Sequence, residues 1–344
     1  MAGIDDQLGQ YEKALEEDQT ALRLDPANSS NYADVAADYI YLNRLNEAHA
    51  TVEQALANNL DSPKLRKRLY QLAFLRNDTA EMLHQVAWAA SKPGIADVLL
   101  ALEAETTAYS GRLTKARELS RQAIVAALNA GERETAATYQ AFAALRESLL
   151  GNRRQAGRQA AEALRLSTGR EVQAVAALAL AFAGEFVQSE KLLTALAREF
   201  PEDTIVRFNY LPMIYAQLAL DSGDSRKAIA TSDVSVAYEL GDHEDRTLTT
   251  AMYPVFVRAQ AYLGAGDGQS AAIEFQKIID HSGITLNRPI GALAHLGLAR
   301  AYVTQGETVK ARAAYRDFLE LWKGADPNIP VLKQAKAENA KLRN

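Results

Sequence analysis

The chain has 344 residues, 48% of them hydrophobic and 24% charged, a composition typical of a folded globular protein. Its 38 Lys and Arg against 43 Asp and Glu give a net charge of −5, which argues against direct binding of nucleic acid. The absence of cysteine excludes disulfides and thiolate metal sites, and no run of apolar residues is long enough to span a membrane.

The first predicted element is a helix over residues 4–24, which contains most of the phrase GQYEKALEEDQTALRLDP at 9–26. A similar phrase, NRLNEAHATVEQALANNLD, occupies 43–61, and its small central residue Ala48 follows Ala14 by 34 residues. The same spacing leads to Met82, a degenerate position, and then to Ala116. A period of about 34 residues is typical of the paired helices of tetratricopeptide repeats.

The period continues, with longer steps, to the end of the chain. The later anchor residues, each at the same place in its second helix, are Ala156, Ser189, Ala228, Ala271 and Ala311. The polar stretch YELGDHEDRTLT at 238–249 lengthens the longest step between them. We therefore predict an all-α protein, a right-handed superhelical solenoid of about nine tetratricopeptide-like hairpins that forms a single domain over residues 1–344.

The two ends of the chain differ from the regular repeats. Thirteen residues precede Ala14, whereas a full first helix would need roughly nineteen at this period. We expect residues 4–24 to be the second helix of a truncated first repeat, in a chain cut from a longer one. At the other end, Asp326–Pro330 breaks the chain and presets a helix start, so residues 327–344 are predicted to form a C-terminal capping helix.

Motifs for catalysis or metal binding are missing from the sequence. The five histidines lack metal-ligand spacing, the glycines of 264–268 do not follow a strand, and the kinase and hydrolase motifs are absent. We interpret the acidic loop Asp242–Asp245 as solvated surface rather than a cation site, and the basic run Arg153–Arg158 as solvated surface rather than a phosphate site. We therefore expect no enzymatic activity, no cofactor and no metal in this chain.

A binding surface can be projected from the geometry of such a superhelix, because its first helices line the inner face. Positions at fixed distances before each anchor then point inward, and seven of them are predicted to contact a peptide: Tyr210, Met213, Gln217, Tyr253, Phe256, Gln260 and Arg300. Aromatic rings offer a large contact area, and glutamine can hydrogen-bond a peptide backbone. The alternative interpretation is that these rings pack between neighbouring repeats.

Two C-terminal segments resemble a known family. They are AMYPVFVRAQAYLGAGDGQSAAIEFQKIIDHSGI (251–284) and ALAHLGLARAYVTQGETVKARAAYRDFLELWKGADPNIPVLKQAKAENAKL (292–342). Both resemble the C-terminal repeat region of large bacterial serine/threonine protein kinases, and EQALANNLDSPKLRKRLYQLAFLRNDTAEMLHQVAWAASKPG (53–94) fits the same region. In that family the catalytic domain is N-terminal and is often followed by a membrane span. The resemblance implies that this chain is the repeat part alone, and no position matches a catalytic residue of the kinase.

The resemblance implies a scaffold that binds a protein or peptide, as the sensory or substrate-recruiting region of such a kinase. That region is extracytoplasmic if the kinase is membrane-anchored, and cytoplasmic otherwise. The same segments also resemble repeats appended to some bacterial winged-helix regulators, so an effector-binding arm of a transcription regulator is the alternative. The sequence leaves the partner, the fused domain, the membrane side and the oligomeric state open.

Overall fold

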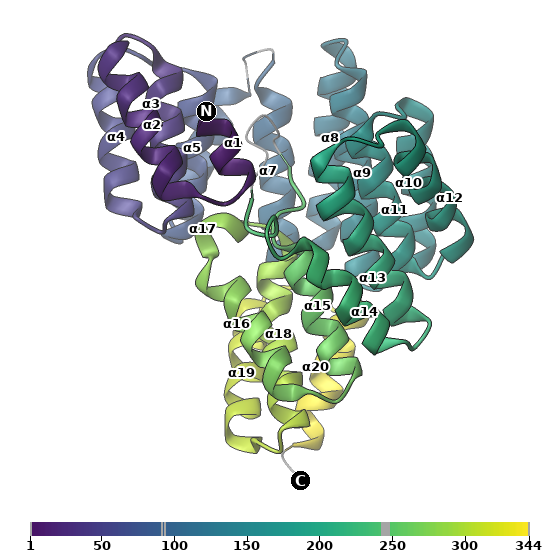
Figure 1. Ribbon diagram of the computed structural model, residues 1–344. Coiled ribbons are helices and arrows are strands. Elements are labelled where there is room, and N and C mark those ends of the chain that lie inside the picture. Colours follow the sequence, from purple (N-terminus) through teal and green to yellow (C-terminus); the bar gives the residue numbers. More distant parts are fainter. Residues whose placement is uncertain (1, 91, 93, 242–247, 343–344) are drawn as a thin grey trace.

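The computed structural model describes residues 2–90, 92, 94–241 and 248–342, which contain helices and no strand (Figure 1). The helices pair in chain order. The first six pairs are α1 (Ala2–Gln7) with α2 (Tyr11–Leu24), α3 (Ser29–Tyr41) with α4 (Leu45–Ala57), α5 (Pro63–Leu75) with α6 (Thr79–Ala89), α7 (Ala96–Tyr109) with α8 (Leu113–Asn129), α9 (Arg133–Leu149) with α10 (Arg153–Leu166), and α11 (Arg170–Ala183) with α12 (Phe186–Glu199).

The later pairs carry additional short elements. They are the π-helix η1 (Val206–Tyr210) and α13 (Leu211–Asp221) with α14 (Ser225–Ser232) and the 3-10 helix η2 (Asp233–Ser235), then α15 (Tyr253–Gly264) with α16 (Gly268–Asp280). After them come the short α17 (Ser282–Thr285), α18 (Pro289–Thr304) with α19 (Thr308–Leu321), and finally α20 (Pro330–Lys341). The prediction of an all-α tetratricopeptide-like solenoid is confirmed.

One local rule builds every hairpin. A residue with φ between 57° and 91° lies five positions before each predicted anchor: Gly9, Asn43, Asn77, Gly111, Gly151, Gly184, Gly223, Gly266 and Gly306. Glycine adopts this left-handed conformation freely and asparagine tolerates it, so the chain can turn sharply after each first helix. Eight of the nine anchors are 0% exposed, and Met82 is partly buried.

The two ends of the described chain depart from the predicted boundaries. Residues 4–24 are not one helix, because Gly9 turns the chain with a φ of 69° between α1 and α2. Tyr11 and Leu15 of α2 are each 4% exposed, so this helix has a packed face. At the C-terminus, α20 begins at Pro330 and packs on α19 with Leu332 and Ala335 buried, whereas 343–344 lie outside the described residues.

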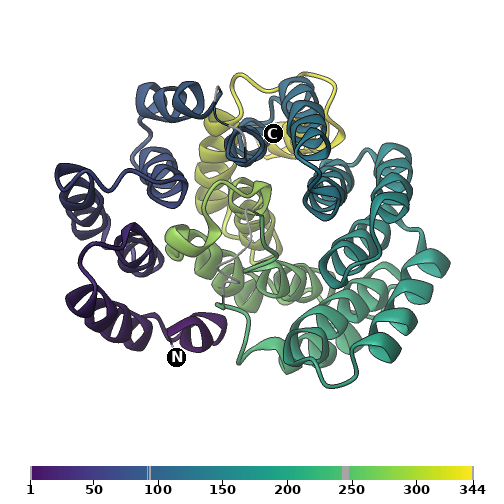
Figure 2. The ribbon, with the colours of Figure 1, turned by 90° about the horizontal axis from the view of Figure 1, so that it is seen from above.

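The solenoid curves until its C-terminal repeats lie inside the curve of its N-terminal repeats. Seen from above, the purple-to-teal helices form an outer ring around the green and yellow ones (Figure 2). Helix α17 contacts α3, and α18 contacts both α7 and α9. The indole nitrogen of Trp322 donates a hydrogen bond of 2.9 Å to the carbonyl oxygen of Tyr109. The inner face of the N-terminal repeats is therefore covered by the chain itself.

The connection between α14 and α15 also crosses to the N-terminus. The hydroxyl of Tyr11 donates to the carbonyl oxygen of Leu240. The buried carboxylate of Glu239 pairs with Arg258 at 2.6 Å and with Lys277, which fixes this part of the connection onto α15 and α16. The predicted acidic loop Asp242–Asp245 lies outside the described residues.

Candidate functional site

Five of the seven side chains predicted to contact a peptide are buried inside the protein, and Phe256 is one of them at 3% exposed. The other four, Tyr210, Met213, Gln217 and Tyr253, are at most 2% exposed and belong to the protein core or its immediate border. The prediction of these contacts assumed that the inner face of the superhelix is open. In the structure, the C-terminal repeats lie inside the curve of the N-terminal repeats. These four residues do not line an open groove, and their burial corresponds to the alternative interpretation of packing between repeats.

Three of the seven predicted residues meet at one cavity. Phe256, Gln260 and Arg300 line a partly open cavity of about 100 Å³ between α9, α11, α15, α16, α18 and the start of α20. The remaining lining residues are mostly apolar: Ser148, Leu149, Phe182, Leu263, Phe275, Leu293, Leu296, Gly297 and Val331. The cavity thus has an apolar floor and a short polar rim, a combination typical of ligand sites in proteins.

Three phenylalanine rings shape the apolar part of this cavity. The ring of Phe256 lies 6.0 Å from that of Phe275 in an edge-to-face arrangement and 6.4 Å from that of Phe182. Phe275 reaches this position because residue 297 is glycine: a Cβ atom there would lie 2.3 Å from the Phe275 ring. Such edge-to-face contacts stabilise aromatic clusters beyond their buried area.

At the polar rim of the cavity, the positive charge of Arg300 is balanced by the negative charge of Glu338. The guanidinium of Arg300 donates to both carboxylate oxygens of Glu338 at 3.0 and 3.1 Å. The Tyr315 hydroxyl donates to the same carboxylate at 2.9 Å. Because Glu338 balances the charge of Arg300, the rim favours a neutral polar group over a free anion.

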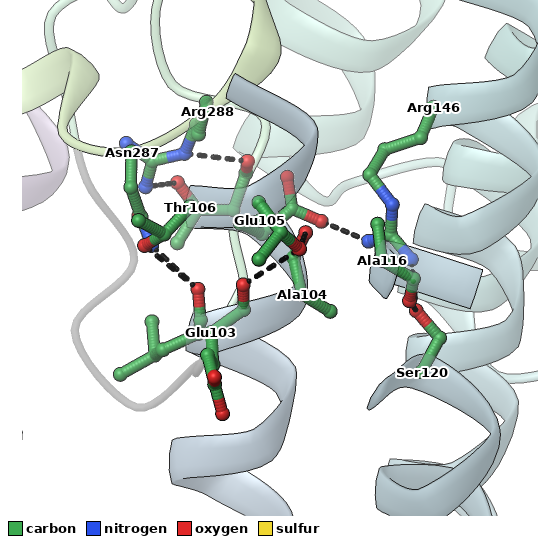
Figure 3. Close-up of polar contacts among 12 residues, drawn as sticks. Glu103, Ala104, Glu105, Thr106, Ala116, Ser120, Arg146, Asn287 and Arg288 are labelled. Atoms are coloured by element: carbon green, nitrogen blue, oxygen red, sulfur yellow. Dashed lines mark hydrogen bonds and ion pairs between the residues drawn. The ribbon is translucent and has the colours of Figure 1, made fainter. Parts of the chain in front are cut away.

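A buried ion pair lies where the two halves of the solenoid meet (Figure 3). Arg146 of α9 reaches the carboxylate of Glu105 on α7 and the hydroxyl of Ser120 on α8. The Glu105 and Arg146 side chains are 2% and 4% exposed. Burial raises the pKa of Glu105 above its ordinary value, and the charge of Arg146 opposes that rise.

Side-chain amides hold the C-terminal repeats onto the inner face. Asn287 donates to the carbonyl oxygen of Leu102 at 2.8 Å and to the hydroxyl of Thr106 at 2.9 Å. Asn43 donates to the carbonyl oxygen of Asp280 and accepts from the backbone N–H of Gly283, both at 2.8 Å. Side chains from both sides of this contact therefore bind polypeptide backbone, and all of that backbone belongs to the same chain.

One group of carboxylates in the described part of the chain has the spacing of cation ligands. Oxygen atoms of Asp6, Asp18 and Asp38, from the first three helices, lie within 4.8 Å of one another. Oxygen is the ligand atom that Mg²⁺ and Ca²⁺ prefer. The sequence search missed this group because its members come from three helices and share no local motif. Spacing is the only evidence for it, and we assign it no function.

Comparisons with known proteins place the fold. No protein-family model matches the sequence, and no curated protein matches it. The human IFIT1 dimer with PPP-AAAA is similar over 99% of this chain and 81% of that chain, with 16% identity and a TM-score of 0.50. Yeast Tom70 is similar over 99% and 87%, with 15% identity and a TM-score of 0.44.

A third solved structure is a tetratricopeptide repeat protein from Parabacteroides merdae ATCC 43184, which is similar over 85% of this chain and 93% of that chain. Its identity is 15% and its TM-score 0.38. The fold is a tetratricopeptide-like helical solenoid. At 16% identity, the likeness to the human IFIT1 structure concerns the fold alone.

Sequence reasoning missed the residues that close this solenoid. Asn43 and Asn77 occupy turn positions where the other hairpins have glycine, so Asn43 was a recognisable exception. Its partner segment around Gly283 is more than two hundred residues away in the sequence, and no periodic signal connects the two.

In the described residues, no helix of the solenoid is both long enough and apolar enough to cross a membrane.

Proposed function

We propose that this chain is a protein-binding scaffold that captures a peptide segment of a partner through the cavity formed by Phe256, Gln260 and Arg300. The observation that carries the proposal is the meeting of an apolar, partly open cavity with a neutral polar rim at the junction of several repeats. Tetratricopeptide-like solenoids have extended surfaces well suited to binding polypeptide.

The size of the cavity supports one apolar side chain as the anchor of the peptide. A dry apolar cavity of about 150 Å³ can hold benzene. The volume here is about 100 Å³, which suits a branched aliphatic side chain. The rings of Phe256 and Phe275 would contact that side chain, and its burial would supply most of the binding free energy.

The polar groups at the rim favour a peptide as the ligand over a small carboxylate. Arg300 is already neutralised by Glu338, so a second carboxylate would have to compete with an existing bidentate pair. The amide of Gln260 offers both a donor and an acceptor, which match the C=O and N–H groups of a peptide backbone.

We further propose that the scaffold is the sensory or substrate-recruiting region of a bacterial serine/threonine protein kinase. The support is the resemblance of residues 251–284 and 292–342 to the repeat region of those kinases. The coding sequence upstream of residue 1 tests this directly. A kinase domain there agrees with the proposal, whereas a winged helix would assign the chain to the transcription regulators.

The peptide-binding proposal can be tested with a displayed library of short peptides. We expect the wild-type chain to enrich peptides that share one branched aliphatic residue. Gln260→Leu, which removes the rim amide, should weaken those peptides at least about tenfold. Gln269→Leu is the matched control because Gln269 is exposed on α16 and does not line the cavity. Equal binding by the wild type and Gln260→Leu would contradict the proposal.

A further inference from the structure

We propose that a groove between α8 and α10 binds an acidic segment of a partner protein, an inference that rests on the proposed scaffold function and adds a second contact surface to it. This outer groove has a volume of about 360 Å³. Its lining includes Arg117, Arg121, Ile124 and Val125 of α8, and Gln155 and Gln159 of α10.

Two of the helices beside the outer groove are longer than the helices next to them. Helices α8 and α9 each have 17 residues, against 14 in each of α7 and α10. The end of α8 is left with an apolar face: Val125 is 49% exposed and Leu128 is 41% exposed. Ala143 of α9 and Ile124 continue this apolar surface into the groove.

The charge around the outer groove is opposite to that of the rest of the chain. Residues 112–168 contain ten Lys and Arg and five Asp and Glu, a net charge of +5. The rest of the chain has 28 basic against 38 acidic residues, a net charge of −10. An acidic partner would therefore be attracted to this region and repelled by the remaining surface.

Two exposed arginines are available for a partner's carboxylates: Arg121 lines the outer groove, and Arg158 lies next to it, hydrogen-bonded to the lining residue Gln155. Arg117 is engaged by Glu147, with hydrogen bonds of 2.6 and 2.8 Å. Arg121 has no ion pair within the described part of the chain, and Arg158 donates only to the neutral amide of Gln155. Because Arg121 comes from α8 and Arg158 from α10, carboxylates of one segment lying along the groove can reach both walls.

The outer groove also contains a buried acceptor that lacks a donor. The amide oxygen of Gln159 is buried and has no hydrogen-bond partner among the described residues. A buried acceptor left without a donor destabilises the state in which it is unsatisfied. If the Gln159 side chain turns outward on binding, a backbone N–H of a bound peptide would satisfy this oxygen.

A peptide suits the outer groove better than a nucleic acid. Glu118 and Glu162 also line it; a nucleic-acid backbone carries a negative charge at every unit and would meet both carboxylates, whereas a peptide can keep its own carboxylates away from them. A peptide can place its acidic residues against Arg121 and Arg158, and an aliphatic residue against Val125. The occupant that we infer is thus a peptide segment with both acidic and aliphatic side chains.

The experiment measures binding by fluorescence anisotropy with three labelled probes. They are a peptide of Asp, Glu and Leu, the same peptide with Lys in place of its acidic residues, and a short poly-uridine RNA. We expect the acidic peptide to bind most tightly, and its Kd to rise at least about tenfold in Arg121→Glu with Arg158→Glu. The control, Arg226→Glu with Arg316→Glu, makes the same change of net charge at two exposed sites elsewhere.

Each other outcome decides between the two sites. The proposal for the outer groove is overturned if the lysine peptide or the RNA binds more tightly than the acidic peptide. It is also overturned if the acidic peptide binds both double variants equally. If Gln260→Leu abolishes capture of library peptides while the acidic peptide does not bind, the scaffold function stands and the groove is overturned. If Gln260→Leu has no effect but charge reversal abolishes acidic-peptide binding, the groove stands and the cavity is overturned. Thermal unfolding of every variant controls for loss of fold.

Discussion

Glu105 on α7 and Arg146 on α9 form an ion pair that is almost fully buried where the N-terminal and C-terminal halves meet. Tyr253 and Arg288 approach the pair from the C-terminal half and interact with it electrostatically. A charge taken out of water in this way depends on its partner, because neither side chain can be rehydrated without opening the protein.

Arg146→Met should therefore destabilise the protein by about 3–5 kcal/mol, because it leaves the Glu105 carboxylate buried without its cation. The measurement is the free energy of unfolding in urea. The double variant Glu105→Leu with Arg146→Met is the control, and it should recover most of the loss since no uncompensated charge remains. A double variant as unstable as the single one would show that packing, rather than charge, dominates at this position.

The loss in Arg146→Met should depend on pH. Burial raises the pKa of Glu105, so the folded state binds its proton more tightly than the unfolded state does. Stability from such a group is fully present below the unfolded pKa and is lost as the pH rises through the folded pKa. The variant should thus be closer to the wild type in acid than at neutral pH. A difference that stays constant between about pH 4 and about pH 7 would contradict this.

The contact between α17 and α3 can be broken by one methyl group. A Cβ atom on Gly283 would lie 1.8 Å from the carbonyl oxygen of Ile40, which cannot move without disturbing α3. Gly283→Ala should cost about 1–3 kcal/mol through this overlap and raise hydrogen exchange in both helices. Gly157→Ala is the matched control, because Gly157 lies in α10 with nothing within 4 Å of its added Cβ. That control should be neutral or more stable by up to about 1 kcal/mol.

The sequence predicts the repeats well because each repeat is built by local rules. The small anchor and the left-handed turn residue recur together, as at Gly111 and Ala116, and both are readable from nearest neighbours. Closure of the solenoid is different. It depends on the summed rotation of many repeats, and contacts such as Tyr11 with Leu240 join residues 229 positions apart. The period of the sequence does not give this total rotation. For that reason an open groove was predicted, with Tyr253 on it.

His295 on α18 provides a test at mildly acidic pH. It lines a cavity between the two halves of the protein, and burial lowers its pKa while Asp317 opposes that change. A lowered pKa means that the folded state holds neutral histidine, so its contribution is present above the unfolded pKa and is lost as the pH falls. Wild-type stability should therefore decline as the pH falls below about 6.5, the ordinary pKa of histidine. His295→Leu should show a smaller decline than the wild type when the free energy of unfolding in urea is measured across this pH range.

The cavity of the proposed peptide site depends on the fit between Gly297 and Phe275. An alanine at 297 would normally favour the helix, but its Cβ atom would lie 2.3 Å from the Phe275 ring. Gly297→Ala should therefore destabilise the protein by about 1–3 kcal/mol. Adding Phe275→Leu removes the clashing ring edge, so the double variant should be more stable than the sum of the two single changes predicts. Because contacting residues couple, an additive result in the unfolding free energies would mean that the ring and the glycine are not in contact in solution.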